Sequence, residues 1–188
     1  LRYLLAQELQ NHNRNKEAVR EYRTLLQYCP NHIGARIALT DIFSYSPATY
    51  AWAIRETLEI LKREPDNYEA HLRLARLYAW SQQYNASVGQ YAWCLNKRPD
   101  ATDVRLELAQ TLSYAKRYKE AIRQYEIILA QDPDREDVRL ELAKLFSYTN
   151  RTEDAIRQYE VILKRNPNNF EASFALANMY SWDRRYYH

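Results

Sequence analysis

Five of the six prolines in this 188-residue chain recur at a nearly constant spacing. Successive members are separated by 35, 34, 34 and 34 residues, and the series is Pro30, Pro65, Pro99, Pro133 and Pro167. A fixed period of this length indicates a repeat protein, in which each unit buries its apolar face against its neighbours. Segments 102–135 and 136–169 support the period, because they are identical at 19 of 34 positions.

Each period contains two amphipathic helices separated by a short polar turn. In 118–129, apolar residues recur at spacings of three and four, as in Tyr118, Ala121, Ile122 and Tyr125, which places them on one side of a helix. The proline stops the second helix, because it lacks an N–H and disfavours helical geometry in the residue before it. Only two glycines are present, which argues against tight β-hairpins. The sequence therefore predicts an all-α chain of eleven helices.

Small and aromatic residues occupy fixed positions of the period. When the extra residue of 33–67 is not counted, the five recurring prolines occupy the thirty-second position, and the eighth position reads Ala6, Thr40, Ala75, Ala109, Ala143 and Ala177. The twentieth reads Ala18, Ala53, Ser87, Ala121 and Ala155, and the twenty-fourth reads Tyr22, Thr57, Tyr91, Tyr125 and Tyr159. A 34-residue helix–turn–helix unit with this pattern resembles the tetratricopeptide repeat (TPR). The resemblance implies a right-handed superhelical solenoid of antiparallel helix pairs.

The register divides 1–188 into one array of five repeats and a terminal helix. The expected units are 1–32, 33–67, 68–101, 102–135, 136–169 and a partial repeat at 170–188. The unit 33–67 has one extra residue near Pro47, so we expect its turn to bulge. We also expect the chain to be a segment of a longer protein, since no methionine opens it.

In the TPR family, partners usually bind the concave face that is lined by the first helix of each pair. The matching positions predict three groups of binding residues here. The apolar group is Leu72, Leu106 and Leu140; the polar group is Arg76, Gln110 and Lys144; the aromatic group is Tyr45, Trp80, Tyr114, Tyr148 and Trp182. Each aromatic occupies the thirteenth position of its repeat and follows a small residue at the twelfth. We call this series of aromatics the aromatic ladder. It either contacts a ligand or packs between repeats, and the sequence leaves both interpretations open.

The chain is interpreted as a non-catalytic scaffold whose concave groove binds a protein or peptide. Chaperone-binding TPR domains hold a C-terminal carboxylate with a clamp that has lysine at the fifth position and asparagine at the ninth. Such a clamp is disfavoured here, because the fifth position is apolar and only Asn178 matches the asparagine of the ninth. A net charge of +3, from 27 basic and 24 acidic residues that are interspersed, argues against nucleic-acid binding. Apolar runs are too short for membrane insertion.

No enzyme, cofactor or metal site is predicted. The four histidines fall at different repeat positions, and Cys29 and Cys94 lack metal-ligand spacing. We expect His71 to pack, Cys94 to be a buried thiol, and Cys29 to be exposed at a helix end.

Two alternative functions come from other classes. The motifs Tyr78-Ala79-Trp80 and Phe146-Ser147-Tyr148 look like those of periplasmic TPR segments in bacterial exopolysaccharide export proteins, which implies contact with a polysaccharide or an assembly partner. An architectural spacer that self-associates through exposed repeat ends is the other alternative; Phe174 and Tyr180 lie in the uncovered last unit. The compartment is periplasmic if the export resemblance holds and cytoplasmic otherwise.

Overall fold

The computed structural model describes the backbone of residues 1–186 and the side chains of residues 1–181. It contains eleven α-helices and one short 3₁₀ helix, and the described residues form no strand. The helices are α1 (Arg2–Asn11), α2 (Asn15–Tyr28), α3 (Ile33–Phe43), η1 (Pro47–Thr49), α4 (Tyr50–Leu61), α5 (Tyr68–Trp80), α6 (Tyr84–Lys97), α7 (Thr102–Tyr114), α8 (Tyr118–Gln131), α9 (Glu136–Tyr148), α10 (Thr152–Arg165) and α11 (Phe170–Tyr186). The predicted all-α class and the eleven helices are confirmed.

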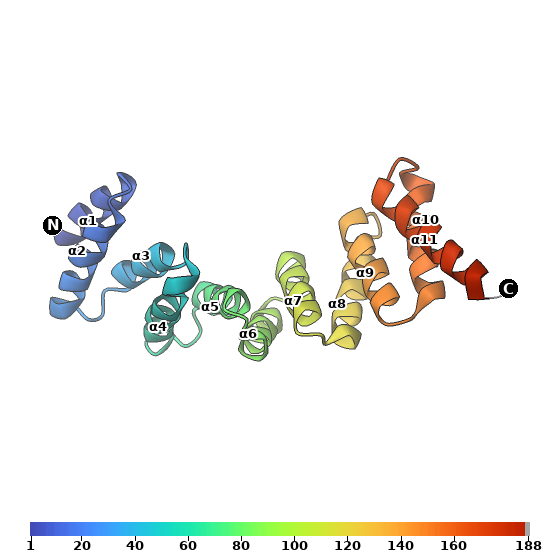
Figure 1. The fold of residues 1–188 in the computed structure, drawn as a ribbon. Helices are drawn as coiled ribbons and strands as arrows, with labels where there is room; N and C mark the ends of the chain where they lie inside the picture. The colour runs from blue at the N-terminus through green and yellow to red at the C-terminus, as the bar shows by residue number, and fades with distance from the viewer. Residues whose placement is uncertain (187–188) are drawn as a thin grey trace. The chain divides into compact units, whose positions relative to one another are not determined.

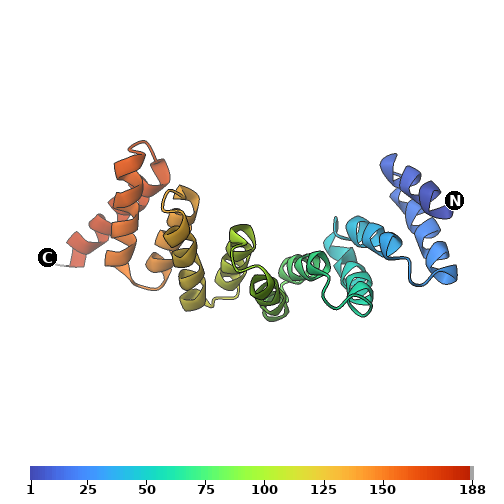
Figure 2. The same cartoon turned by 180° about the vertical axis from the view of Figure 1, so that it is seen from behind.

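The chain forms two compact units, Leu1–Lys97 and Arg98–His188. In unit 1, the helices pair as α1 with α2, α3 with α4, and α5 with α6 (Figure 1). In unit 2, α7 pairs with α8 and α9 with α10, and α11 packs on α10. Within each unit, the second helix of one pair also contacts the first helix of the next pair (Figure 2). We call the first helix of each pair its A helix and the second its B helix.

The small and aromatic positions of the repeat form the core, as predicted. The twentieth position is completely buried in all five repeats: Ala18, Ala53, Ser87, Ala121 and Ala155. The twenty-fourth position is at most 3% exposed: Tyr22, Thr57, Tyr91, Tyr125 and Tyr159. A small residue lets the two helices of a pair approach closely, and the neighbouring ring fills the remaining space, so volume is matched within each repeat.

The second repeat fills the same space with two threonines. Thr40 and Thr57 occupy the eighth and twenty-fourth positions, where most other repeats have alanine and tyrosine, and both are buried. Their hydroxyl oxygens lie 3.4 Å apart. Each hydroxyl also donates to a carbonyl of its own helix, of Arg36 and Ala53 respectively. The polar substitution is therefore accommodated without an unpaired buried hydroxyl.

Four A–B turns place a non-glycine residue in the left-handed region. These are Asn13, Gln82, Lys116 and Asn150, with φ between 57° and 60°, and all occupy the fifteenth position of their repeat. At Lys116, the N–H donates to the Ser113 carbonyl at 3.0 Å, and the Arg117 N–H donates to the Leu112 carbonyl at 2.9 Å. This pair of bonds is the Schellman motif that satisfies the last carbonyls of a helix.

The turn of the second repeat differs because its fifteenth residue is Pro47. Proline holds φ near −65°, so it cannot adopt the left-handed conformation used at the other four turns. The chain instead forms η1, with Pro47 in its first turn, and the Thr49 hydroxyl donates to the Phe43 carbonyl at 2.6 Å. The predicted bulge is thus confirmed, and it takes the form of an extra 3₁₀ turn.

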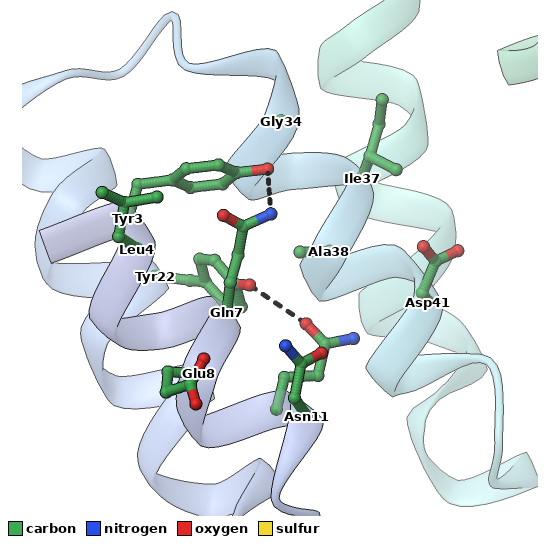
Figure 3. A pocket seen from close by; sticks show the side chains of 11 residues that line it. Tyr3, Leu4, Gln7, Glu8, Asn11, Tyr22, Gly34, Ile37, Ala38 and Asp41 are labelled. Carbon is green, nitrogen blue, oxygen red and sulfur yellow. Dashed lines mark hydrogen bonds between the residues drawn. The ribbon is translucent and has the colours of Figure 1, made fainter.

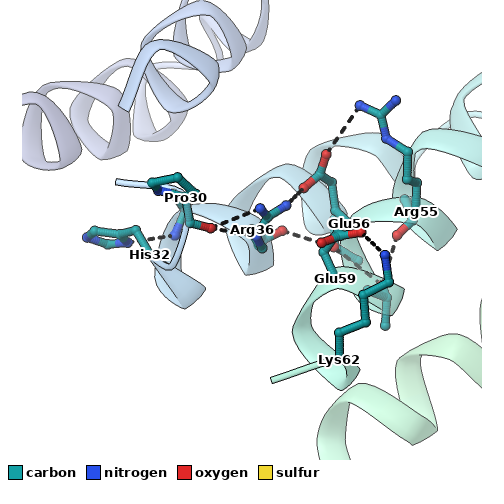
Figure 4. A network of polar contacts seen from close by, with 11 residues as sticks. Pro30, His32, Arg36, Arg55, Glu56, Glu59 and Lys62 are labelled. Atoms are coloured by element: carbon teal, nitrogen blue, oxygen red, sulfur yellow. Dashed lines mark hydrogen bonds and ion pairs between the residues drawn. The ribbon is translucent and has the colours of Figure 1, made fainter. Parts of the chain in front are cut away.

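A polar contact that recurs at the fourth position ties α3, α5, α7 and α9 to the preceding repeat. In Figure 4, the Arg36 guanidinium donates to the Pro30 carbonyl at 2.9 Å and to the Glu56 carboxylate at 2.5 Å. Arg105 makes the equivalent contacts with the Pro99 carbonyl at 2.6 Å and with Gln124 at 2.9 Å. The guanidinium has several donors in one plane, so it satisfies both partners at once.

His71 takes the place of this arginine in the third repeat. Its Nε2 lies 2.8 Å from the Pro65 carbonyl oxygen, and its Nδ1 lies 2.6 Å from Gln90 Oε1. The imidazole also stacks on the ring of Trp93, with a centroid distance of 3.6 Å. The prediction of a packed histidine is confirmed.

Candidate functional site

The aromatic ladder lies on the surface. Its described side chains are 53% to 85% exposed: Tyr45, Trp80, Tyr114 and Tyr148. Trp182 belongs to α11, but its side chain lies outside the described residues. Trp80 also lies near the Tyr50 ring, at a centroid distance of 6.1 Å. Most of the area of these rings is therefore available for contact rather than buried between repeats.

The apolar group predicted at the fifth position lies deeper than the ladder. Leu72 is 7% exposed and belongs to the core, and Leu106 and Leu140 are half-buried. None of the three lines a cavity described below. Their part in binding stays a prediction, whereas their packing role follows from their burial.

Three cavities occupy equivalent places between successive A helices. They lie between α1 and α3, between α3 and α5, and between α7 and α9, with volumes of about 470, 490 and 360 Å³ respectively. Residues at the ninth, twelfth and thirteenth positions of the leading repeat line all three. Within each unit, we call the surface of its A helices that contains these cavities the A-helix face of that unit.

The cavity between α1 and α3 is mainly polar (Figure 3). The Gln7 amide donates to the Tyr3 hydroxyl at 3.2 Å, and the Tyr22 hydroxyl donates to Gln10 at 3.0 Å. Asn11 occupies the thirteenth position here, so this cavity has no ladder ring. Burial raises the pKa of Tyr22 to about 12, with nearby Tyr3 and Asp41 adding to the shift, so its phenol remains protonated at neutral pH.

The cavity between α3 and α5 continues from the first, because Gln10 and Asp41 line both. Tyr45 and Trp80, two consecutive members of the ladder, are also among its lining residues. Arg73 forms an ion pair with Asp41, and the remaining charged residues of the cavity are Glu69 and Arg76. Two carboxylates and two guanidinium groups therefore balance each other.

The cavity between α7 and α9 is richest in tyrosine. Its rings are Tyr114 and Tyr148 from the ladder, with Tyr118 and Tyr125 from α8. Burial raises the pKa of Tyr125 to about 12, and a contact with the Ser113 hydroxyl opposes part of this shift. This tyrosine therefore keeps its hydroxyl proton throughout the physiological range.

Lys144 is the ammonium group of this cavity, and two carboxylates hold it. Its Nζ lies 2.9 Å from Glu141 Oε1 in α9 and 2.7 Å from Glu171 Oε1 in α11. Burial alone would lower the pKa of Lys144, but the hydrogen bonds to Glu171 and Glu141 outweigh burial and raise the pKa above its ordinary value. The ammonium is thus permanently charged and already neutralised.

The predicted polar group lines these cavities. Arg76 belongs to the cavity between α3 and α5, and Gln110 and Lys144 belong to the cavity between α7 and α9. The sequence did not single out Arg73, Tyr118 or Glu141 as lining residues. In the sequence they are marked only by their positions in the repeat, the sixth and the seventeenth. These positions indicate a cavity lining only once the packing of successive A helices is known.

Among the described residues, the side chains that titrate do not cluster into a metal centre. Within the described part of the chain, no group of three or more His, Cys, Asp or Glu residues has the geometry to hold a metal ion. Cys29 is exposed and Cys94 is buried, as predicted. None of the helices described between residues 1 and 186 has the length and apolarity needed to cross a membrane.

Comparisons with known proteins agree with this geometry. Residues 112–179 match the family model of the tetratricopeptide repeat, and no curated protein sequence matches the chain. The crystal structure of YrrB, a TPR protein with an unusual peptide-binding site, matches with a TM-score of 0.74 at 17% identity, over 93% of this chain and 89% of that chain. The chain has the fold of a TPR solenoid.

Two MamA structures show a similar likeness. One matches with a TM-score of 0.72 at 14% identity, covering 86% of this chain and 94% of that one. A second, MamA AMB-1, matches with a TM-score of 0.70 at 19% identity, covering 86% and 95%. At these identities the likeness establishes the TPR fold. It does not bear on the resemblance to exopolysaccharide export proteins, which stays a prediction.

Proposed function

We propose that this TPR array is a non-catalytic scaffold that binds an extended peptide segment of a partner protein along the A-helix face of either unit. The observation that carries the proposal is the coincidence of the ladder with the cavities. Two cavities are each lined by two consecutive ladder aromatics, which are Tyr45 with Trp80 and Tyr114 with Tyr148. Exposed aromatic rings beside a hollow are the usual anchors of protein interfaces.

Further support comes from the polar groups between the rings. The amide side chains of Gln10 and Gln110 and the hydroxyl of Ser44 line the cavities, and such groups can donate to and accept from a peptide backbone. The structural neighbour YrrB has a peptide-binding site, which makes a peptide the first ligand to test.

The proposal is tested by selecting peptides from a displayed random library against the wild-type chain. Affinity of each selected peptide is then measured for the wild type and for Trp80→Ala/Tyr114→Ala. Truncating an aromatic anchor costs about 2 kcal/mol or more, which is about a thirtyfold loss of affinity. Tyr28→Ala is the matched control, because Tyr28 is 78% exposed at the end of α2 and lines none of the three cavities.

Retained affinity in the double variant, with helicity unchanged, would show that the ladder does not anchor the peptide. The glycan alternative predicts a different outcome. Oligosaccharide added to the wild type would then change the fluorescence of Trp80. The change would be weakened in Tyr45→Ala, which keeps Trp80 as the reporter in the same cavity, and no displayed peptide would depend on the ladder.

A further inference from the structure

The A-helix face of unit 2 carries an excess of carboxylates. In the register, its second, sixth and ninth positions hold, besides Glu107, which has a contact of its own, four acidic residues and one lysine: Asp103, Asp137, Glu141, Glu171 and Lys144. Arg135 adds a second positive charge from the preceding turn, where it pairs with Asp137 at 2.6 Å. The carboxylates still outnumber the cations, so the face attracts positively charged ligands.

The ion pairs of the cavity between α7 and α9 also favour a positively charged ligand. Lys144 is 30% exposed, whereas its two partners, Glu141 and Glu171, are 46% and 55% exposed. The lysine side chain is therefore less exposed than the two carboxylate side chains that flank it. A carboxylate has two oxygens and can accept several hydrogen bonds, so each partner can accept another donor while it holds the lysine.

The rings of this cavity suit a cation as well. Tyr114 and Tyr148 are 71% and 73% exposed, and Tyr118 and Tyr125 complete the lining. The face of an aromatic ring attracts ammonium and guanidinium groups. Leu145 supplies an apolar surface for the methylene stem that precedes the charge in lysine and arginine.

An acidic ligand is disfavoured at the same place. Its carboxylate would have to displace Glu141 or Glu171 from Lys144 and leave a charge without its partner. The cavity of unit 1 between α3 and α5 is lined by two carboxylates and by the guanidinium groups of Arg73 and Arg76, whereas the one ammonium that lines the cavity between α7 and α9 is shared by Glu141 of the lining and by Glu171, which reaches it from α11. The two cavities thus offer different chemistry at the same repeat positions.

We propose that the cavity between α7 and α9 binds a basic side chain, arginine or lysine, of the bound peptide. This assignment rests on the proposed function and adds the chemical class of one ligand residue. It assigns the guanidinium or ammonium group to Glu141, Glu171 and the faces of the Tyr114 and Tyr148 rings, and the side-chain stem to Leu145.

The test uses three end-blocked tripeptides, Gly-Arg-Gly, Gly-Gln-Gly and Gly-Glu-Gly, titrated into the isotopically labelled full chain and followed by two-dimensional NMR. We expect the arginine peptide to shift the amide signals around Tyr114, Lys144 and Tyr148, with an affinity at least about tenfold higher than that of the glutamate peptide. Added salt should weaken this binding, because the charges involved are partly exposed.

Two charge variants give effects of opposite sign. Glu141→Gln should weaken binding of the arginine peptide about threefold, and Lys144→Gln should strengthen it about threefold, since it removes a competing cation. Glu126→Gln and Lys164→Gln are the matched controls, because they make the same charge changes at exposed positions of the B helices α8 and α10. The controls should leave the affinity unchanged.

A preference for the glutamate peptide, lost in Lys144→Gln, would overturn the inference by making the cavity an anion site, and peptide binding through the ladder would still stand. Shifts of equal size with all three peptides would also overturn it. If none of the three shifts these signals, the cavity does not hold a basic side chain; the displayed-library selection with Trp80→Ala/Tyr114→Ala then decides the proposed function separately.

Discussion

Tyr114 and Tyr125 line the same cavity, and truncating each of them to alanine should have very different effects on stability. Tyr125 occupies the twenty-fourth position and is 1% exposed, whereas Tyr114 belongs to the ladder and is 71% exposed. Removing a buried aromatic side chain costs about 3–5 kcal/mol, because it leaves a void that the surroundings fill only in part. An exposed substitution usually changes the free energy of unfolding by no more than about 0.5 kcal/mol.

Urea unfolding followed by far-ultraviolet circular dichroism measures this difference. Tyr125→Ala should lower the unfolding midpoint strongly, and in a thermal scan it should lower the Tm by roughly 6–20 °C for a chain of this size. Tyr114→Ala should unfold almost like the wild type. Because repeat arrays can lose two-state behaviour, the comparison is made between midpoints of the same transition.

Equal losses in the two variants would refute the reasoning. They would show that the ladder ring packs between repeats, as the alternative interpretation of the sequence allows. A stable Tyr125→Ala variant would instead contradict the assignment of the twenty-fourth position to the core.

Three further predictions follow from the turns, the small positions and the buried tyrosines. Lys116→Gly should raise the free energy of unfolding by about 0.5–1 kcal/mol, because glycine adopts the left-handed φ of 59° without strain. Asn150→Gly should raise it by less, since asparagine tolerates this conformation. Equal increases in the two variants would contradict the explanation. Ala109→Leu should cost about 1–3 kcal/mol by overpacking a completely buried position, and an unchanged melting curve would contradict the register. Burial raises the pKa of Tyr22 and Tyr125 to about 12 from an ordinary value of about 10. Their contribution to stability is therefore complete below pH ~10 and is lost as the pH rises through 12. In a pH titration of the folded chain, the tyrosinate absorbance should rise in a late phase, and Tyr125→Phe should diminish that phase.

The helices and the core could be predicted because they depend on features that repeat in the sequence. Alanine or serine at the twentieth position and tyrosine at the twenty-fourth appear in four of the five repeats, and both positions are buried. Pro47 indicated an irregular turn in advance. Periodicity of this kind records local geometry and contacts between neighbours, which are the contacts that dominate a solenoid.

The turns and the polar contacts were harder to predict. Gln82 and Lys116 adopt positive φ although neither residue type favours it, so only the demand of the helix pair for a tight turn explains them. Arginine recurs at the fourth position of the repeat, as at Arg105, but its partner, the Pro99 carbonyl, is a backbone group. A backbone group has no side chain that the sequence could reveal, so the contact could not be predicted.

The cavities depend on tertiary geometry. The sequence placed Lys144 on the predicted binding face, but not between Glu141 and Glu171, the second of which belongs to the next repeat. Whether a ring at the thirteenth position is exposed or packed also depends on how closely successive A helices approach. The register therefore predicted some of the residues of the site. The chemistry of each cavity became known only from the structure.

The central claim is that a peptide binds along the A-helix face, and a chemical-shift map of the labelled chain with a library-selected peptide tests it most directly. The account predicts that the perturbed amides cluster at the ninth, twelfth and thirteenth positions, around Trp80 in α5 and Tyr148 in α9, and spare the outer surfaces of α8 and α10. Perturbations confined to those B helices, with the ladder signals unchanged, would contradict the account.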